Sequence, residues 1–102
     1  MKKYIMLEDD TIEIDGHILY RIESLINFTY VEAGDEGGYI ESEENLSHEG
    51  ECWVFDAAAV YENARIEDNA IICADSEISG NCIIRGNVTV QGMRLSGNCY
   101  IS

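Results

Sequence analysis

The sequence is short of basic residues: it has 20 Asp and Glu against 6 Lys and Arg, which gives a formal net charge of −14. This balance argues against direct binding to nucleic acid or to an anionic membrane, because each phosphate contact requires a cation. No stretch approaches the roughly 20 apolar residues of a membrane helix. Residues 1–10 contain two lysines but no apolar core of signal-peptide length. These absences predict a cytoplasmic protein with one small domain.

The spacing of the cysteines does not indicate a metal or redox site. There are four, Cys52, Cys73, Cys82 and Cys99. They contain no CxxC pair and no metal-ligand spacing with either histidine. We therefore expect thiols rather than disulfides, no metal and no cofactor.

The N-terminal part carries the pattern of a β-hairpin. In the segment TIEIDGHILYRI, two runs rich in β-branched and aromatic residues flank Asp15-Gly16. Asp-Gly supplies the positive φ angles of a two-residue type I′ turn. Ile12 and Ile14 alternate with polar neighbours, which is the period of a half-buried strand. The following segment, residues 21–28, fits either a continued strand or a short helical turn.

From residue 52 onward the sequence repeats every six residues. The repeated aliphatic positions are Val54, Val60, Ile66, Ile72, Ile78, Ile84 and Val90. Small side chains precede most of them by two places, and Asp, Glu, Ala or Gly follows two places later. A period of six drifts against the 3.6-residue turn of a helix, and a β-meander needs about 8–12 residues per unit. Hexapeptide periodicity is typical of a parallel β-helix.

The repeat also predicts which residues stack. Three hexapeptides make a triangular coil of about 18 residues, so positions 18 apart lie on neighbouring coils. Asn63 should lie over Asn81, Asn69 over Asn87, and Glu67 against Arg85. Gly, Asp and Asn at the corners tolerate a left-handed backbone.

The register slips by one residue near the end. Leu95 and Ile101 resume the repeat after the loss of one position, which aligns Cys99 with Cys82. We interpret this pair as small apolar fillers of an inner column. The array ends after fewer than three coils and exposes apolar and backbone groups, which predicts self-association into a symmetric oligomer. The expected fold is all-β, with a hairpin region over residues 1–36 and a short left-handed parallel β-helix over 37–102.

A longer motif resembles a known family. The matching residues are Gly37, Gly38, Tyr39, Ile40, Glu41, Ser42, Glu43, Asn45, Leu46, Ser47, Trp53 and Val54. They are similar to the Gly-Gly-aromatic-Ile-Glu-Ser-Glu-x-Asn-Leu-Ser motif of bacterial and prophage-encoded hexapeptide-repeat proteins. The resemblance implies a left-handed β-helix behind a small N-terminal β element, in a protein of a bacterial host cell. Members of this type carry more repeats than this chain.

The acidic residues suggest the function that we favour from the sequence. Residues 1–51 hold 14 of the 20 acids. Carboxylates on a rigid scaffold can imitate a phosphate backbone and occupy a basic groove. We therefore expect a non-enzymatic, phage-type inhibitor that binds a nucleic-acid-binding host protein in the manner of an anti-CRISPR. The partner-binding residues would be Glu41, Glu43, Glu44, Glu49, Glu51, Glu62 and Asp68.

Other functions stay open on the sequence. An oligomeric sponge for a signalling nucleotide would use Arg65, Arg85 or Arg94, with Tyr61 or Tyr100 stacked on the base. Many left-handed β-helices are acyltransferases that use a histidine base, but His17 and His48 both lie outside the regular repeats. A purely structural module is a further alternative.

Overall fold

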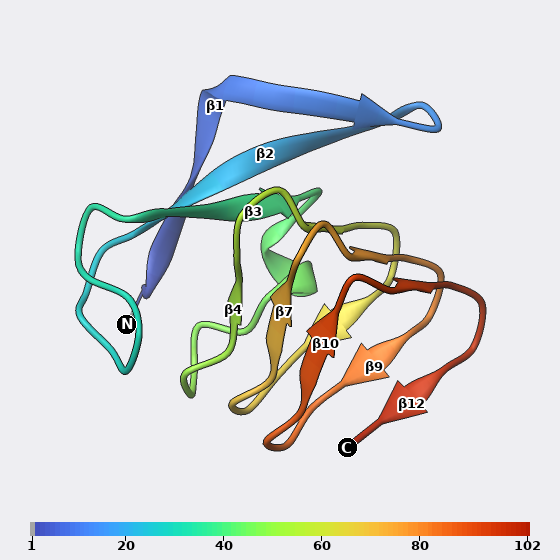
Figure 1. Cartoon of the computed structure of the whole chain (residues 1–102). Coiled ribbons are helices and arrows are strands. Elements are labelled where there is room, and N and C mark those ends of the chain that lie inside the picture. The colour runs from blue at the N-terminus through green and yellow to red at the C-terminus, as the bar shows by residue number, and fades with distance from the viewer. Residues whose placement is uncertain (1) are drawn as a thin grey trace.

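Short strands wind around one core in the computed structural model, which describes residues 2–102 (Figure 1). The strands are β1 (Tyr4–Ile14), β2 (His17–Ser24), β3 (Glu36–Ile40), β4 (Trp53–Val54), β5 (Ala59–Val60), β6 (Arg65–Ile66), β7 (Ile71–Cys73), β8 (Glu77–Ile78), β9 (Ile83–Ile84), β10 (Thr89–Gln91), β11 (Arg94–Leu95) and β12 (Tyr100–Ile101). A single 3-10 turn, η1 (Glu43–Asn45), is the one helical element of the described residues. None of these elements is a helix long and apolar enough to cross a membrane.

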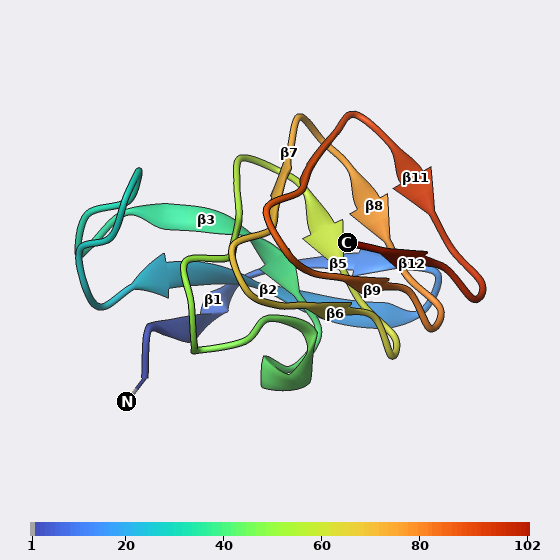
Figure 2. The same cartoon turned by 90° about the horizontal axis from the view of Figure 1, so that it is seen from below.

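The coil has three flat faces, and Figure 2 shows its successive coils side by side, with β5, β8 and β11 in one row. The first face contains β3, β5, β8 and β11, the second β4, β7 and β10, and the third β6, β9 and β12. Neighbouring strands within each face of the coil are parallel. This is the short left-handed parallel β-helix that the hexapeptide period predicts.

The repeated residues occupy the positions that the period assigns to them. Val54, Ile72 and Val90 are paired in register and buried, as are Ile66 and Ile84. The corners between faces take a left-handed backbone, and the non-glycine residues there include Asp56, Glu62 and Asp68. Glycine occupies the equivalent corner positions of later coils, because it adopts positive φ at little cost. These residues are Gly80, Gly86, Gly92 and Gly97.

Polar side chains also stack as expected. The amide of Asn63 donates to Asn81 at 3.2 Å, and that of Asn69 donates to Asn87 at 3.0 Å. Arg85 lies 4.0 Å from Glu67, but its closer carboxylate partner is Asp68 at 3.3 Å. In each of these asparagine stacks, hydrogen bonds between side chains along the coil axis replace hydrogen bonds to water.

The predicted slip is confirmed, but the predicted thiol state is wrong. Leu95 pairs with Ile78, 17 residues earlier, and Ile101 pairs with Ile84. The slip brings Cys99 beside Cys82, with their Cα atoms 4.4 Å apart, and the two form a disulfide. Cys52 and Cys73 are free. The spacing of the repeats predicts that the two cysteines are neighbours, but it does not indicate that they form a disulfide.

The N-terminal hairpin continues the first face of the coil. β1 and β2 are antiparallel and meet at Asp15 and Gly16, both of which have positive φ, as the turn signal predicts. β2 pairs antiparallel with β3, which in turn runs parallel to β5. The ambiguous segment from residue 21 stays in a strand until Ser24 and then leaves the sheet. One sheet therefore contains both the hairpin and the first face of the coil (Figure 1).

One buried cluster joins the hairpin to the coil. Tyr4 and Ile22 from the hairpin pack with Trp53 and the inner columns of the coil. Lys3 is buried as well, and its ammonium donates to the carbonyl oxygen of Cys52 at 2.7 Å. Burial lowers the pKa of Lys3, because it penalises the charged form.

Candidate functional site

A buried asparagine fixes the acidic turn after β3. The Asn45 side chain is fully buried and accepts hydrogen bonds from the backbone N–H groups of Glu41 and Ser42, at 3.0 and 2.9 Å. Its amide group donates to the carbonyl oxygens of Glu62 and Ala64 on the next coil. Asn45 therefore holds Glu41 and Glu62, which are 21 residues apart in the sequence, on adjacent coils. This contact explains the asparagine of the Glu-Ser-Glu-x-Asn-Leu-Ser motif.

A small apolar cluster holds the hairpin against the outer surface of the first face. Leu19 from β2 packs with Tyr39, Ala59 and Tyr61, and Ile12 and Ile14 from β1 pack against this cluster. The inward residues of the same strands belong to the core of the coil, so these contacts lie on the opposite surface of the sheet. The start of β2 is thereby placed over the coil.

His17, the first residue of β2, lies among acids from two coils. Its Nδ1 is 2.8 Å from Glu41 Oε2, and its Nε2 is 3.4 Å from Glu62 Oε2. The His17 ring also packs against the Tyr61 ring, with centroids 5.5 Å apart. Glu41 is fixed on its other side, because its Oε1 accepts the backbone N–H of Glu62 at 2.8 Å. A histidine oriented by a carboxylate is therefore present on this surface.

The same contacts shift both pKa values. The hydrogen bond that His17 donates to Glu41, reinforced by the charges of Glu41, Glu62 and Asp15, raises the pKa of His17 above 6.5. Partial burial opposes ionisation of Glu41, but the hydrogen bonds from His17 and from the Glu62 backbone lower the pKa of Glu41 overall. The pair therefore favours imidazolium and carboxylate over the two neutral forms.

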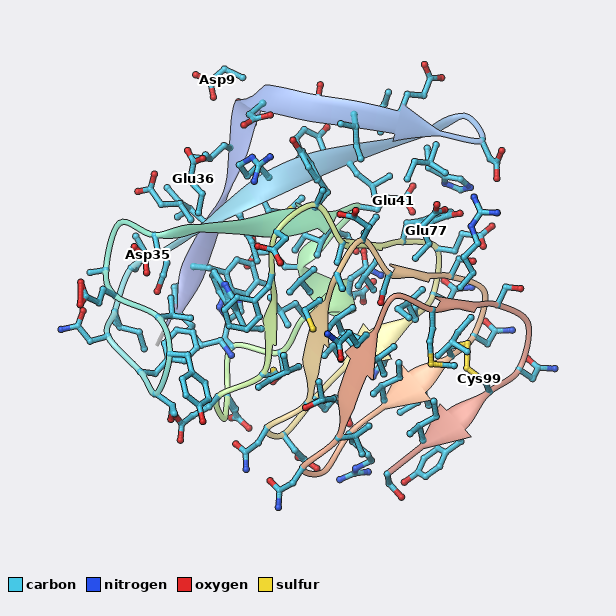
Figure 3. All side chains as sticks on the ribbon, in the orientation of Figure 1. Asp9, Asp35, Glu36, Glu41, Glu77 and Cys99 are labelled. Carbon is cyan, nitrogen blue, oxygen red and sulfur yellow. A yellow bond between two sulfur atoms is a disulfide. The ribbon has the colours of Figure 1, made fainter. Side chains whose placement is uncertain are left out.

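A cavity of about 260 Å³ opens next to this pair. It is lined by Asp15, Tyr61, Glu77, Ser79, Arg94, Leu95 and Ser96. Tyr61 and Asp15 connect it to His17, through ring contact and through the hairpin turn. Glu77 and Arg94 are paired neighbours on β8 and β11, and their side chains form an ion pair at 3.1 Å. Figure 3 shows Glu41 and Glu77 in the region under the hairpin turn.

Two residues that line this cavity carry hydroxyl groups and are themselves largely buried. Tyr61 is 6% exposed and Ser79 is 8% exposed. Burial raises the pKa of Tyr61, and a hydrogen bond between the Tyr61 and Ser79 side chains partly opposes that shift. No hydrogen bond joins either hydroxyl to any other described residue. Both groups therefore have donor or acceptor capacity left for a molecule in the cavity.

His48 has a different role. Its Nδ1 accepts the backbone N–H of Lys3 at 3.0 Å, and its Nε2 is 2.7 Å from Glu43 Oε1. The ring is stacked on Tyr4 at 4.1 Å. Both ring nitrogens are thus used in holding the N-terminal strand, which leaves neither available to a reactant.

The seven acids predicted to bind a partner do not form one free surface. Glu41 bonds with His17, Glu43 with Lys2 and His48, Glu51 with Thr29, and Asp68 with Arg85. Glu62 accepts the backbone N–H of Gly80 and faces His17. Within residues 2–102, Glu44 and Glu49 have no ion pair or side-chain hydrogen bond. Binding of a basic partner through these acids stays a prediction.

Other parts of the described chain offer less chemistry. No group of three or more His, Cys, Asp or Glu within residues 2–102 could hold a metal ion. A cavity of about 230 Å³ lies between the β2–β3 loop and the second face. It is lined by Phe28, Thr29, Tyr30, Val31, Glu51, Phe55, Asn69, Ile71 and Asn87, and contains no histidine or cysteine.

Sequence reasoning missed His17, Ser79 and the role of Glu77. His17 was set aside because it precedes the repeats, yet the hairpin returns it to the coil. The sequence does contain a signal for the two coil residues. Side chains alternate along a strand, so the residues before and after a buried aliphatic residue point out of the coil. Glu77 and Ser79 flank Ile78 in this way. The pairing of β2 with β3 had no equivalent signal, because an irregular segment separates them.

The comparison with known proteins gives one relevant relative. No protein-family model matches the chain. The protein named "Uncharacterized acetyltransferase YdcK" from Escherichia coli (strain K12) is 32% identical over 95 residues. The match covers 86% of this chain and 28% of the relative. The chain therefore spans less than a third of the length of that protein.

This match changes one expectation and supports part of another. The prediction that the chain is not an enzyme is contradicted, because the relative is named an acetyltransferase. The coil and the match together fit a hexapeptide-repeat β-helix. Neither bears on a prophage origin or on inhibition of a host complex, which stay predictions.

Proposed function

We propose that the chain carries an acetyltransferase site on the outer surface of its first face, with His17 as the general base. The observation that carries this proposal is the 2.8 Å contact between His17 Nδ1 and Glu41 Oε2. The carboxylate favours the tautomer with the proton on Nδ1, so that Nε2 is the basic nitrogen. The name of the relative supplies the reaction class.

The expected reaction is acyl transfer from an acetyl thioester. His17 Nε2 removes a proton from the acceptor, and the acceptor atom attacks the carbonyl carbon of the thioester. The new bond to carbon forms as the C–S bond breaks, and the thiol leaves with a proton. Glu41 orients the ring and stabilises its protonated form without itself becoming protonated.

The cavity supplies polar groups for the rest of the reaction. The hydroxyls of Tyr61 and Ser79 are suited to hold a carbonyl oxygen that gains negative charge, because both can donate an O–H group from the wall of the cavity. Arg94 is the cation at this cavity, and its side chain is 83% exposed at the rim. It fits an anionic part of the donor that stays outside the cavity.

A thiol-release assay with acetyl-coenzyme A tests the proposal, with a mixture of small amines and sugars as acceptors. We expect His17→Gln to lower kcat/KM by about 100-fold or more, since general-base catalysis contributes factors of that order. Glu41→Gln should lower it less, because the ring remains. For the unmodified protein, kcat/KM should rise with pH through the raised pKa of His17, above 6.5.

The second histidine supplies the matched control. His48→Gln removes an imidazole that holds the N-terminal strand. It should lower the melting temperature and leave kcat of the folded protein close to normal. Normal turnover in folded His17→Gln, or acetyl transfer that depends on His48, would refute the assignment.

A further inference from the structure

We propose that the acceptor in this site is a small molecule or chain end that carries a primary ammonium group, bound beside the facing side chains of His17 and Glu62. This inference rests on the acetyltransferase function proposed above and names its substrate class. It is carried by an arrangement of hydrogen-bond acceptors, by the charge around the cavity and by two hydroxyl groups that line the cavity.

Two acceptor atoms face each other next to Tyr61, which lines the cavity. Above the raised pKa of His17 the ring is neutral; Nδ1 keeps its proton toward Glu41, and Nε2 presents a lone pair. Glu62 Oε2 lies 3.4 Å from Nε2, and an ionised carboxylate is also only an acceptor. Two acceptors at this distance repel each other unless a donor lies between or beside them. A primary ammonium group has three N–H donors and satisfies both atoms at once, whereas a hydroxyl group has one.

The charge around the site favours the same ligand. The carboxylates of Asp15, Glu41 and Glu62 are close enough to raise the pKa of His17, and Glu77 lines the adjoining cavity. Arg94, paired with Glu77, is the cation that lines this cavity. Four carboxylates against one guanidinium attract a cation and disfavour an acceptor that carries its own carboxylate or phosphate.

The cavity provides room and further hydrogen bonds for the rest of the acceptor. Its volume of about 260 Å³ lies slightly below the usual range of small-molecule sites, which begins at about 300 Å³, so it fits only a small acceptor. The hydroxyls of Tyr61 and Ser79 have only each other as partners among residues 2–102. They can therefore bond polar atoms of a small ligand, and Leu95 offers an apolar contact.

The bound ammonium also fits the proposed reaction. An ammonium nitrogen has no free electron pair, so it must lose a proton before it attacks. Neutral His17 accepts that proton at Nε2, the amine electron pair forms the C–N bond, and the C–S bond breaks to release the thiolate. The second proton lost from the nitrogen protonates the thiolate, so that amide, thiol and imidazolium result. Glu62 holds the ammonium before transfer and the imidazolium afterwards.

A matched pair of probes tests the inference without requiring turnover. Propane-1,3-diamine and propane-1,3-diol have the same number of heavy atoms and differ in charge. The pKa of His17 is measured by nuclear magnetic resonance during titration with each compound. We expect the diamine to bind at least tenfold more tightly than the diol and to lower the pKa of His17, because a cation replaces the imidazole proton beside Glu62.

Two variants with equal loss of charge separate a specific site from general attraction to an acidic protein. Glu62→Gln should weaken diamine binding at least tenfold and remove its effect on His17. Glu49→Gln, on a carboxylate without a partner among the described residues, should change neither. Equal binding of diol and diamine, or equal effects of the two variants, would overturn the inference.

Two further outcomes would distinguish the ammonium site from the proposed acetyltransferase activity. Diamine binding that depends on Glu62, without acetyl transfer to any acceptor, would leave the ammonium site standing and refute the acetyltransferase. Acetyl transfer that depends on His17 but prefers the diol over the diamine would do the reverse.

Discussion

Asn45 shows how one side chain can define a turn and two neighbouring coils. Its side chain forms hydrogen bonds with four backbone groups. Two belong to Glu41 and Ser42 in its own turn, and two belong to Glu62 and Ala64 on the next coil. No other residue type has a carbonyl and an amide group on so short a side chain. Its place in the motif was visible in the sequence, but its partners were not, because they depend on the stacking of Glu62 and Ala64.

We expect Asn45→Ala to lower the free energy of unfolding by about 3 kcal/mol, because it leaves several buried backbone groups without partners. Chemical denaturation measures this value. Asn63→Ala is the control, since it removes an exposed ladder bond and should cost about 1 kcal/mol or less. Equal losses for the two variants would contradict the role assigned to Asn45.

The His17–Glu41 pair makes stability depend on pH in a defined window. The folded pKa of His17 is raised above 6.5, so its contribution is complete below that value and is lost as pH rises through the folded pKa. The folded pKa of Glu41 is lowered below 4.5, so its contribution is present above that value and is lost as pH falls. The pair contributes most between these limits.

Thermal unfolding of the native protein and of His17→Gln should therefore differ most between pH 4.5 and 6.5. The difference should shrink at higher pH, as the folded histidine loses its proton. A difference that grows steadily from pH 6 to 9 would have the wrong sign for this pair.

At the scale of elements, Gly37 and Gly38 allow β3 to join the coil. A Cβ atom on Gly38 would overlap the carbonyl oxygen of Ala58 and approach Val54 Cγ1 to 2.7 Å. On Gly37 it would approach the carbonyl oxygen of Val54 to 2.5 Å. Neither glycine has positive φ, so close approach of two chains, and not backbone conformation, requires them.

Gly38→Ala should therefore destabilise the protein by about 3 kcal/mol, the upper part of the range for overpacked cores. Gly34→Ala is the matched control: it has a positive φ but no atom near the added methyl, and it should cost about 1 kcal/mol. Denaturant titration of both variants measures the difference. A harmless Gly38→Ala would mean that β3 does not pack as closely as the structure shows.

The elements also show what could be predicted from the sequence. The coil was predictable, because every hexapeptide repeats the same inward aliphatic residue and the same type of corner. One register fits residues 54 to 90, and a slip of one residue accounts for Leu95 and Ile101. The hairpin turn was predictable from Asp15-Gly16 alone. The docking of the hairpin was not, because it depends on contacts such as Leu19 with Tyr39, which join segments without a shared period. Since the candidate site lies at that contact, its residues could not be assembled from sequence.

At the scale of the whole molecule, the charge is strongly unbalanced. A net charge of −14 repels itself in the folded state more than in the expanded chain. Raising NaCl from 20 to 300 mM shortens the screening length to less than about 10 Å. We therefore expect the melting temperature to rise with NaCl. A fall would mean that the surface ion pairs, such as Glu77–Arg94, outweigh the repulsion.

The attachment of the hairpin to the coil also has a consequence for kinetics. His17 belongs to the hairpin, whereas Glu62, Ser79 and Glu77 belong to the coil, so the site exists only while the hairpin is closed. The hairpin tip rests on a small cluster, while the coil has its own interior. Opening of the hairpin tip should therefore cost less free energy than global unfolding. Warming would then remove the assembled site before the coil melts, so that the temperature optimum of the proposed activity would report a local equilibrium and lie below the melting point of the chain.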